Sequence, residues 1–184
     1  MKITLAIDTA TARTQFAILK GDELLWQEIE DGATTHGDVL AKFGALAARE
    51  KIDQVIVGMG PGPYTGLRAG IAFAQAFAWA RNIELTGVCS LDAIACTASE
   101  YIAATDARRK EIYWAHYKEG KRVNGPHVNL PTEVSGTHFV GEGAHKYGLC
   151  ADATYPEVSR FHLLSHVDQP MYLRRPDAVP TVER

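Results

Sequence analysis

The sequence of 184 residues has few cysteines, no large excess of one charge and no long apolar run. Its three cysteines are an odd number without a CxxC spacing, which argues against a disulfide framework and favours reduced thiols in the cytoplasm. The net charge of −3 gives no basic field that would draw the whole chain onto nucleic acid. No stretch reaches the roughly 18 apolar residues of a membrane span, and Asp8 interrupts the short apolar start. We therefore expect a cytoplasmic protein without a signal peptide or a membrane anchor.

Familiar nucleotide and metal motifs are missing as well. The glycine-rich loop at 58–66 lacks the Gly-Lys-Ser/Thr ending of a P-loop, and Pro63 stands where a dinucleotide fingerprint has its third glycine. His162 and His166 have the i, i+4 spacing of a helical metal pair, but a third ligand is not obvious. Two ordinary histidines are the preferred interpretation, so we expect no metal site.

What the sequence contains is an alternation of strands and helices, which predicts an α/β fold with a mixed sheet flanked by helices. We expect strands at 2–7, 15–19 and 23–29, a helix at 36–49, a strand at 54–57, a helix within 64–80, a strand at 84–88, a helix at 90–98, and strands at 101–105 and 111–117. An apolar strand, an aspartate and a hairpin occur twice, at Asp8 and at Asp106, which indicates two related lobes. After Lys118 repeated prolines weaken the pattern. We therefore predict an N-terminal lobe at 1–99 and a smaller, shortened lobe at 100–184.

The helix after the glycine-rich loop carries almost no charge, since Arg68 is the one charged side chain from Tyr64 to Ala80. A helix that is apolar all round must be covered on more than one side. Its small and aromatic residues form three rows at i, i+4 spacing, which are Ala72, Ala76 and Ala80, then Gly70, Ala74 and Ala78, then Phe73 and Phe77. A helix enclosed between the sheet and a neighbouring helix explains these rows. The sharper hypothesis gives one face to a partner chain, shared with the helix at 36–49.

Two further features allow a phosphate ligand. Asp8 and Thr9 follow the first strand, where a carboxylate beside hydroxyls suits a Mg²⁺–phosphate contact, although a turn that uses an Asx or Thr side chain explains them equally. Asp106 would be the matching second carboxylate. The basic run at 108–110 lies at the tip of the second hairpin, where a solvated turn is the ordinary interpretation and contact with a phosphate or an acidic partner is the alternative.

Five segments carry a resemblance to a known family. They are AIDTAT at 6–11, GPGPYTGLRAG at 60–70, SLD at 90–92, DARRKEIYWA at 106–115 and PMYLR at 170–174. In this order they resemble the TsaB (YeaZ) family, the bacterial partner of the tRNA threonylcarbamoyladenosine transferase TsaD. The resemblance implies an actin-like, sugar-kinase-like ATPase fold of two ribonuclease H-like lobes. It also implies a role in placing threonylcarbamoyl on the adenosine next to the anticodon.

The resemblance implies a scaffold without catalysis of its own, which pairs with TsaD, is joined by TsaE and forms homodimers when alone. It implies that tRNA is met only through the complex, that no cofactor is required, and that ATP or ADP can bind at the partner interface. Family contacts run through the first two helices. The expected partner-contact residues are His36, Leu40, Phe43, Tyr64, Leu67, Arg68, Ile71 and Gln75. The catalytic relative's metal-binding histidine pair falls on the region from Tyr64 to Ala80, which has no histidine here.

Two other classes of function stay open. One is a working enzyme, a small actin-fold ATPase or phosphotransferase that uses Asp8 and Asp106. ATP turnover by the purified chain that disappears in Asp8→Ala would favour it. The other, weaker alternative is a metallopeptidase, for which the ligands and the general base are not visible in the sequence.

Overall fold

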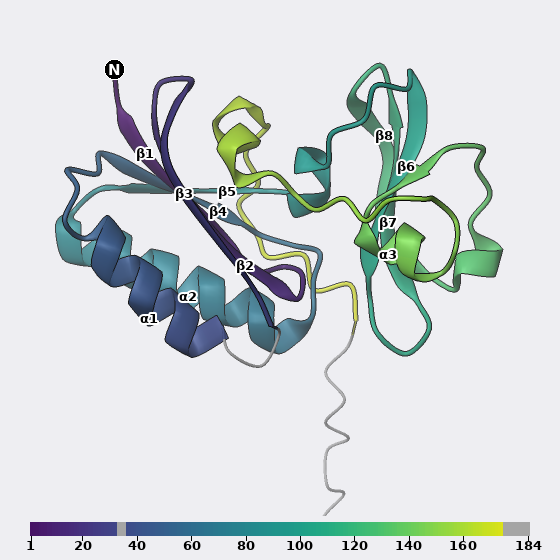
Figure 1. Ribbon diagram of the computed structural model, residues 1–184, viewed down its shortest axis with the longest axis horizontal. Helices are drawn as coiled ribbons and strands as arrows, with labels where there is room; N and C mark the ends of the chain where they lie inside the picture. The colour runs from purple at the N-terminus through teal and green to yellow at the C-terminus, as the bar shows by residue number, and fades with distance from the viewer. Residues whose placement is uncertain (33–35, 175–184) are drawn as a thin grey trace, which may run out of the picture.

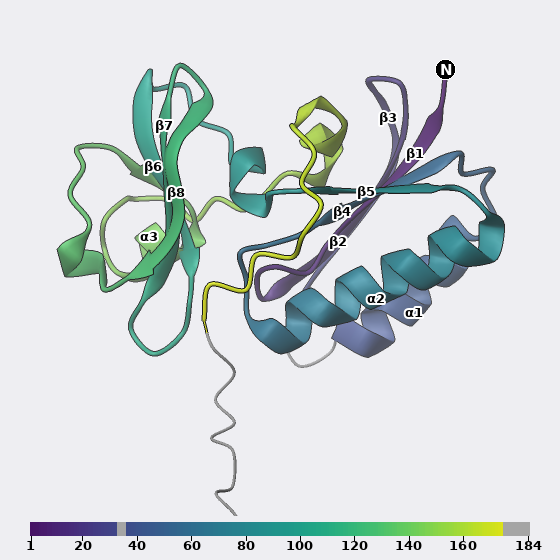
Figure 2. The ribbon, with the colours of Figure 1, turned by 180° about the vertical axis from the view of Figure 1, so that it is seen from behind.

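The computed structural model describes residues 1–32 and 36–174, which form two lobes (Figure 1). The first lobe has a five-stranded mixed sheet in the order β3-β2-β1-β4-β5. Its strands are β1 Ile3–Asp8, β2 Arg13–Lys20, β3 Glu23–Asp31, β4 Gln54–Gly58 and β5 Glu84–Val88. Helices α1 (His36–Ala47) and α2 (Tyr64–Arg81) lie side by side on one face of this sheet (Figures 1 and 2). The predicted α/β class, a mixed sheet flanked by helices, is confirmed.

The second lobe has a four-stranded sheet in the order β8-β7-β6-β9. Its elements are β6 Glu100–Asp106, β7 Ile112–Lys118, β8 Lys121–Asn129, the 3-10 turn η2 Pro131–Glu133, β9 Phe139–Val140 and α3 Glu142–Lys146. This order corresponds to β3-β2-β1-β4 of the first sheet. In both lobes the first strand, β1 or β6, ends at an aspartate and pairs with the next strand in an antiparallel hairpin. Between β8 and β9 the only helical element is η2, which stands where α1 stands in the first lobe. The second lobe is therefore a shortened copy of the first.

The chain returns to the first lobe after α3. The 3-10 turn η3 (Val158–Leu163) buries Val158 and Phe161 in a cluster with residues of β1, β2 and β4. Further on, the backbone N–H of Met171 donates to the carbonyl of Met59 (2.8 Å), and Figure 2 shows this last described segment running between the lobes. The predicted boundary after residue 99 coincides with the start of β6. Within the predicted second lobe, the segment from about 156 to 167 packs on the first lobe. Residues 175–184 of that prediction lie outside the described chain.

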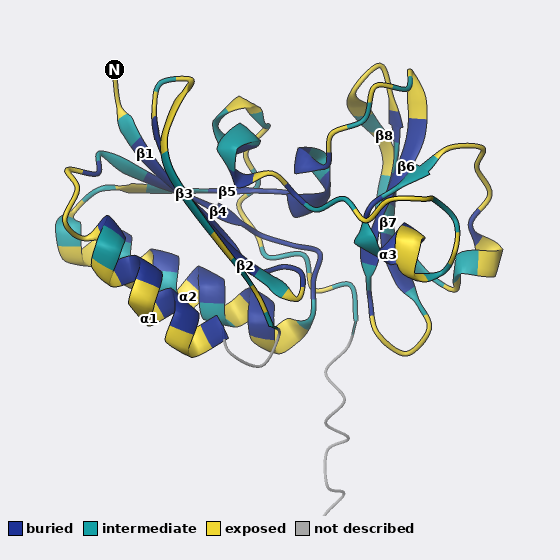
Figure 3. Ribbon diagram, viewed as in Figure 1, coloured by how far each residue is buried: buried dark blue, intermediate teal, exposed yellow. Residues whose placement is uncertain are grey.

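The main core lies between the first sheet and the two long helices. Phe16 of β2 contacts Phe43 of α1 and Phe73 of α2 edge to face, with ring centroids 5.5 and 5.6 Å apart. The helices approach closely because small residues face the contact. A Cβ at Gly44 would overlap the ring of Phe73, and Ala74 is fully buried. The outward sides of both helices are left exposed (Figure 3).

One expectation about secondary structure fails, and one strand was not predicted. The predicted helix at 90–98 is wrong, since the chain forms only the 3-10 turn η1 (Ser90–Ala93) and is extended from Ile94. Ser90 directs its hydroxyl to Asp8 instead of capping a helix. Strand β8 went unpredicted because Pro126 interrupts its pattern, and an edge strand tolerates proline. None of the helices in the described chain combines the length and apolarity needed to cross a bilayer.

Candidate functional site

The carboxylate of Asp8 is enclosed where β1, β4 and η1 meet. Asp8 is fully buried, and its two oxygens accept hydrogen bonds from the Ser90 hydroxyl (2.5 Å) and the backbone N–H of Ala10 (2.9 Å). A Cβ at Gly58 would overlap the same carboxylate, so glycine is required there for packing. Burial raises the pKa of Asp8 to about 6, against the lowering effect of the two hydrogen bonds.

Thr9, which the sequence places with Asp8 at a candidate Mg²⁺–phosphate contact, is also part of the packing. Its hydroxyl donates to the carbonyl of Gly66 (2.8 Å), which ties the β1–β2 turn to the first turn of α2. A Cβ at Gly70 would overlap this hydroxyl. Magnesium keeps several water ligands and needs carboxylate oxygens that it can reach. The enclosed Asp8 and Thr9 side chains therefore do not fit a magnesium–nucleotide group.

Asp106, the matching carboxylate of the second lobe, is engaged differently. Lys146 donates to one of its oxygens (2.6 Å), and the backbone N–H of Arg108 donates to the other (3.1 Å). No hydrogen bond or ion pair joins Asp106 to Asp8 within the described residues. The two aspartates thus mark equivalent strand ends of two lobes, each with partners of its own.

The structure corrects five of the eight predicted partner contacts. His36, Leu40, Phe43, Leu67 and Ile71 are 0–6% exposed and belong to the interior of the first lobe. His36 illustrates the reason, because its Nδ1 lies 2.6 Å from the Thr14 hydroxyl of β2. Both predicted helices form, but these five residues are buried in the first lobe and cannot line a docking surface.

The other three predicted contacts, Tyr64, Arg68 and Gln75, are on the exposed side of α2. We define the outer helix face as the exposed, uncharged positions of both helices around Gln75. They are Ala41 and Ala45 on α1 and Ala72, Gln75, Ala76, Trp79 and Ala80 on α2. Trp79 is 87% exposed, and no residue from 69 to 80 is charged. The row Ala72, Ala76 and Ala80 was visible in the sequence, whereas the exposure of Trp79 was not.

The segment at 172–174 connects the N-terminal end of α2 with the tip of the second lobe's first hairpin. The rings of Tyr64 and Tyr172 lie 5.1 Å apart, and Arg68 donates to the Tyr64 hydroxyl (2.9 Å). Two residues beyond Tyr172, Arg174 donates to the carbonyl of Arg108 (3.3 Å) in the turn between β6 and β7. The two lobes therefore share one surface at this end of the molecule.

Arg108 of the β6–β7 turn also affects the pKa of a histidine in the first lobe. Burial lowers the pKa of His36, and the positive charge of Arg108 lowers it further. The first turn of α1 and the β6–β7 turn thus lie within electrostatic reach of each other.

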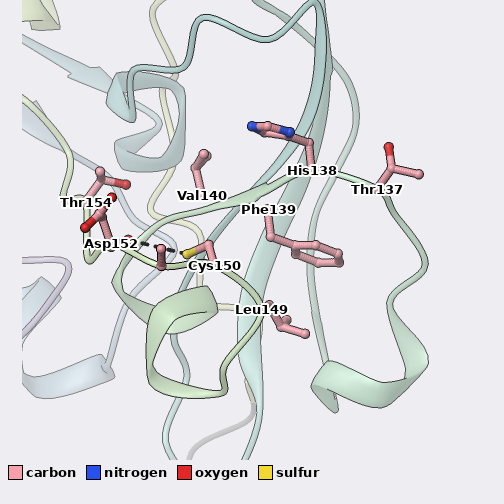
Figure 4. A pocket seen from close by; sticks show the side chains of 9 residues that line it. Thr137, His138, Phe139, Val140, Leu149, Cys150, Asp152 and Thr154 are labelled. Carbon is pink, nitrogen blue, oxygen red and sulfur yellow. Dashed lines mark hydrogen bonds between the residues drawn. The ribbon is translucent and has the colours of Figure 1, made fainter.

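A cavity of about 360 Å³ lies in the second lobe beside β9 (Figure 4). It is lined by Thr137, His138, Phe139, Val140, Leu149, Cys150, Ala151, Asp152 and Thr154. The Cys150 thiol contacts the carbonyl of Asp152 (3.4 Å), and burial raises the pKa of this thiol. Figure 4 shows that the His138 ring does not point toward the sulfur. The arrangement therefore lacks the activated thiolate of a cysteine nucleophile.

His162 and His166 do not form a pair. His162 lies in η3 with its Nε2 3.0 Å from Asp22, whereas His166 lies beyond η3 in a β-bridge with Val88. Among the described residues no group of three or more His, Cys, Asp or Glu side chains could hold a metal ion.

Comparison with known proteins identifies related sequences. The family of TsaD, tRNA N6-adenosine threonylcarbamoyltransferase, matches residues 39–165. An uncharacterized protein of Mycobacterium tuberculosis is 39% identical over 197 residues, which cover 96% of this chain and 93% of that protein. The tRNA threonylcarbamoyladenosine biosynthesis protein TsaB of Escherichia coli is 34% identical over 134 residues, which cover 62% of this chain and 54% of that protein. The matched part is thus about half the length of the relatives named TsaB.

A solved structure has the same fold. The crystal structure of a Pseudomonas aeruginosa protein with similarity to the peptidase YeaZ superposes with a TM-score of 0.77 at 24% identity, covering 95% of this chain and all of that one. The two-lobed arrangement is therefore shared over nearly the whole described chain.

Proposed function

The chain belongs to the TsaB (YeaZ) family, and from this membership we propose that it is a scaffold subunit of the tRNA threonylcarbamoyl transferase complex. In this proposal it pairs with TsaD and is joined by TsaE, and the complex places threonylcarbamoyl on the adenosine next to the anticodon. The observation that carries the proposal is the outer helix face, which no part of the described chain covers. Its α2 part has no charged residue from 69 to 80, whereas α1 exposes Asp38 and Lys42 beside Ala41.

The composition of this face supports helix-to-helix docking. Alanines at Ala41, Ala45, Ala72 and Ala76 leave room for the side chains of a facing helix pair, and the interaxial distance of packed helices shortens when the contact residues are small. Trp79 supplies the large aromatic anchor that interfaces often contain near their energetic centre. The absence of charge between residues 69 and 80 removes the desolvation cost that a charged face would carry.

We propose that the chemistry belongs to TsaD and that this chain has no catalysis and no required cofactor of its own. The enclosure of Asp8 and Thr9 supports this, because neither side chain is open to a phosphate. The alternative of a small ATPase that uses Asp8 and Asp106 has less support, because Asp8 is enclosed. A nucleotide in the complex would have to bind at a surface that does not include Asp8 and Thr9.

We further propose that the same face forms a homodimer when TsaD is absent. A face with small residues and one exposed tryptophan can bury itself against a second copy through an isologous contact. Homodimer and heterodimer would then compete, so addition of TsaD should convert a homodimer into a mixed pair.

The test is a reconstituted tRNA modification assay with the TsaD and TsaE of the same organism, in which each subunit is left out in turn. We expect no modified tRNA without this chain and normal modification with Asp8→Asn, which keeps the shape of the enclosed side chain. Full modification without this chain would overturn the scaffold proposal. ATP hydrolysis by the purified chain that Asp8→Asn abolishes would replace it by the ATPase alternative.

A further inference from the structure

The turn between β6 and β7 has an unusual concentration of positive charge and a fixed backbone. Arg108, Arg109 and Lys110 are all exposed and all in the left-handed region, with φ of 62°, 51° and 66°. Three consecutive residues without glycine rarely adopt this conformation. The turn is fastened by hydrogen bonds from Ala107 N–H to the Glu111 carbonyl (3.0 Å) and from Glu111 N–H to the Arg108 carbonyl (2.9 Å). The basic side chains therefore project from a fixed backbone.

The neighbouring carboxylates do not cancel this charge. Glu111 is ion-paired with Arg174, and Asp106 is bound by Lys146 at 2.6 Å. We define the basic cluster as Arg108, Arg109, Lys110, Lys146 and Arg174. Among the residues that the structure describes, these five cations adjoin three carboxylates, namely Asp106, Glu111 and Glu142, so this group of side chains has a net positive charge. Since the whole chain has a net charge of −3, this local excess is not a consequence of overall composition.

An exposed aromatic pair adjoins the basic cluster. Tyr64 and Tyr172 are 44% and 43% exposed with ring centroids 5.1 Å apart, and Tyr172 is two residues from Arg174. Figure 2 shows the end of the described chain between the start of α2 and the lower end of the second lobe, where the β6–β7 turn lies. Basic side chains together with exposed aromatic rings are typical of surfaces that contact RNA, with cations on the phosphates and rings against the bases.

We propose that the basic cluster and the Tyr64–Tyr172 pair form a direct contact surface for RNA. The identity of that RNA as the tRNA substrate rests on the proposed function, whereas the contact itself follows from charge and geometry. It differs from the expectation that tRNA is met only through the complex. An exposed turn spread between two lobes suits a polymer backbone better than a small anion, which requires an enclosed site with buried donors. The aromatic pair favours RNA over an acidic protein surface.

The test uses the full chain, alone and in complex with TsaD, and a fluorescently labelled unmodified tRNA transcript followed by anisotropy. The variant is Arg108→Asn, Arg109→Asn and Lys110→Asn together, because asparagine tolerates the left-handed backbone. The matched control removes three exposed lysines elsewhere, Lys20→Asn, Lys51→Asn and Lys121→Asn. Lys121 lies at the β7–β8 turn, the opposite end of the same sheet (Figure 1). Circular dichroism and thermal unfolding verify the fold of both.

We expect the turn variant to bind tRNA at least about tenfold more weakly and to lower the slope of log Kd against log salt by about 2, since each lost phosphate contact removes close to one released counterion. The control should change the affinity by less than about twofold. Should the triple variant fail to fold, Lys110→Asn alone provides the measurement, with about one unit less of salt slope.

Three results would overturn the proposal. Equal weakening by the turn variant and the control means that only total charge matters. Unchanged tRNA affinity with lost TsaD pairing means that the cluster docks an acidic protein, and unchanged affinity with intact pairing means that it contacts neither. A failure of the proposed function is recognised separately, since tRNA modification would then proceed without this chain whatever the turn variant binds.

Discussion

The hydroxyl of Ser90 donates a 2.5 Å hydrogen bond to the carboxylate of Asp8, a residue 82 positions earlier in the chain. Both side chains are buried, so the contact joins the end of β1 to the turn that follows β5. Asp8, a candidate phosphate ligand from the sequence, is therefore a buried residue that stabilises the first lobe. The predictions for Asp8 and its neighbours concern stability for that reason.

Asp8→Asn should remove a pH dependence of stability. The folded-state pKa of Asp8, about 6, lies above its ordinary value of 3.8, so the contribution of protonated Asp8 is present below about pH 4 and is lost as the pH rises through 6. Asparagine does not titrate. The free energy of unfolding of the variant relative to the wild type should rise by on the order of 3 kcal/mol from about pH 4 to pH 7. Urea unfolding over this range measures it, and a constant difference would contradict the raised pKa.

Gly58→Ala should destabilise the first lobe through the same cluster. The added methyl would overlap the Asp8 carboxylate and approach the Ser90 hydroxyl, both of which are held in place. Overpacking of this kind costs about 1–3 kcal/mol. The control is Gly37→Ala in the first turn of α1, where a Cβ meets nothing within 4 Å. It should be neutral or stabilising by up to about 1 kcal/mol. Equal effects of the two substitutions in thermal unfolding would contradict the packing described for Gly58.

Asp92→Asn should weaken the connection between the lobes. Asp92 of η1 accepts a hydrogen bond from Tyr117 of β7 (2.7 Å) and pairs with Arg122 of β8 (2.9 Å), with both charged side chains less than a quarter exposed. Loss of the charge leaves a partly buried guanidinium without its partner, which costs about 1–3 kcal/mol. The control is Glu84→Gln, which removes the ion pair between Lys2 (62% exposed) and Glu84 (57% exposed). Loss of this exposed pair should lower the free energy of unfolding by less than about 1 kcal/mol. Denaturant unfolding compares them, and a larger loss in Glu84→Gln would contradict this account.

Trp79→Ala should weaken docking without weakening the fold. The side chain is 87% exposed, so its removal gives up little burial within the chain, and we expect a stability change within about 0.5 kcal/mol. As an aromatic anchor of an interface it should cost about 2 kcal/mol of TsaD binding, roughly 30-fold in Kd. Calorimetric titration and thermal unfolding give the two values. Unchanged TsaD affinity would remove Trp79 from the interface.

The sequence predicts most of the first lobe because each element there has a local signal. Strand β5 has the predicted bounds, and α2 follows the uncharged run after the glycine-rich loop. The helix expected after Ser90 fails because that hydroxyl has a distant partner, which a local capping rule does not include. Strand β8 was missed because edge strands tolerate the proline that weakens the pattern.

The sequence identified the two helices of the outer helix face but not which of their residues are exposed. Apolarity identified α1 and α2, but Phe43 and Ile71 satisfy the same criterion by packing on their own sheet. A charge placed at either residue would test the folding of the lobe instead of its docking. The orientation of each helix depends on contacts with residues far along the chain, such as Phe16 with Phe43 and Phe73.

The most direct measurement of the docking account is the affinity of TsaD from the same organism for the wild-type chain and for Ala76→Glu, determined by isothermal titration calorimetry. Ala76 is exposed at the middle of the outer helix face, so a glutamate there leaves the fold intact and places a charge inside the proposed interface. Ala151→Glu, exposed in the second lobe, is the control. We predict at least about 30-fold weaker binding for Ala76→Glu and unchanged binding for the control. Equal, wild-type affinity in both variants would contradict the account.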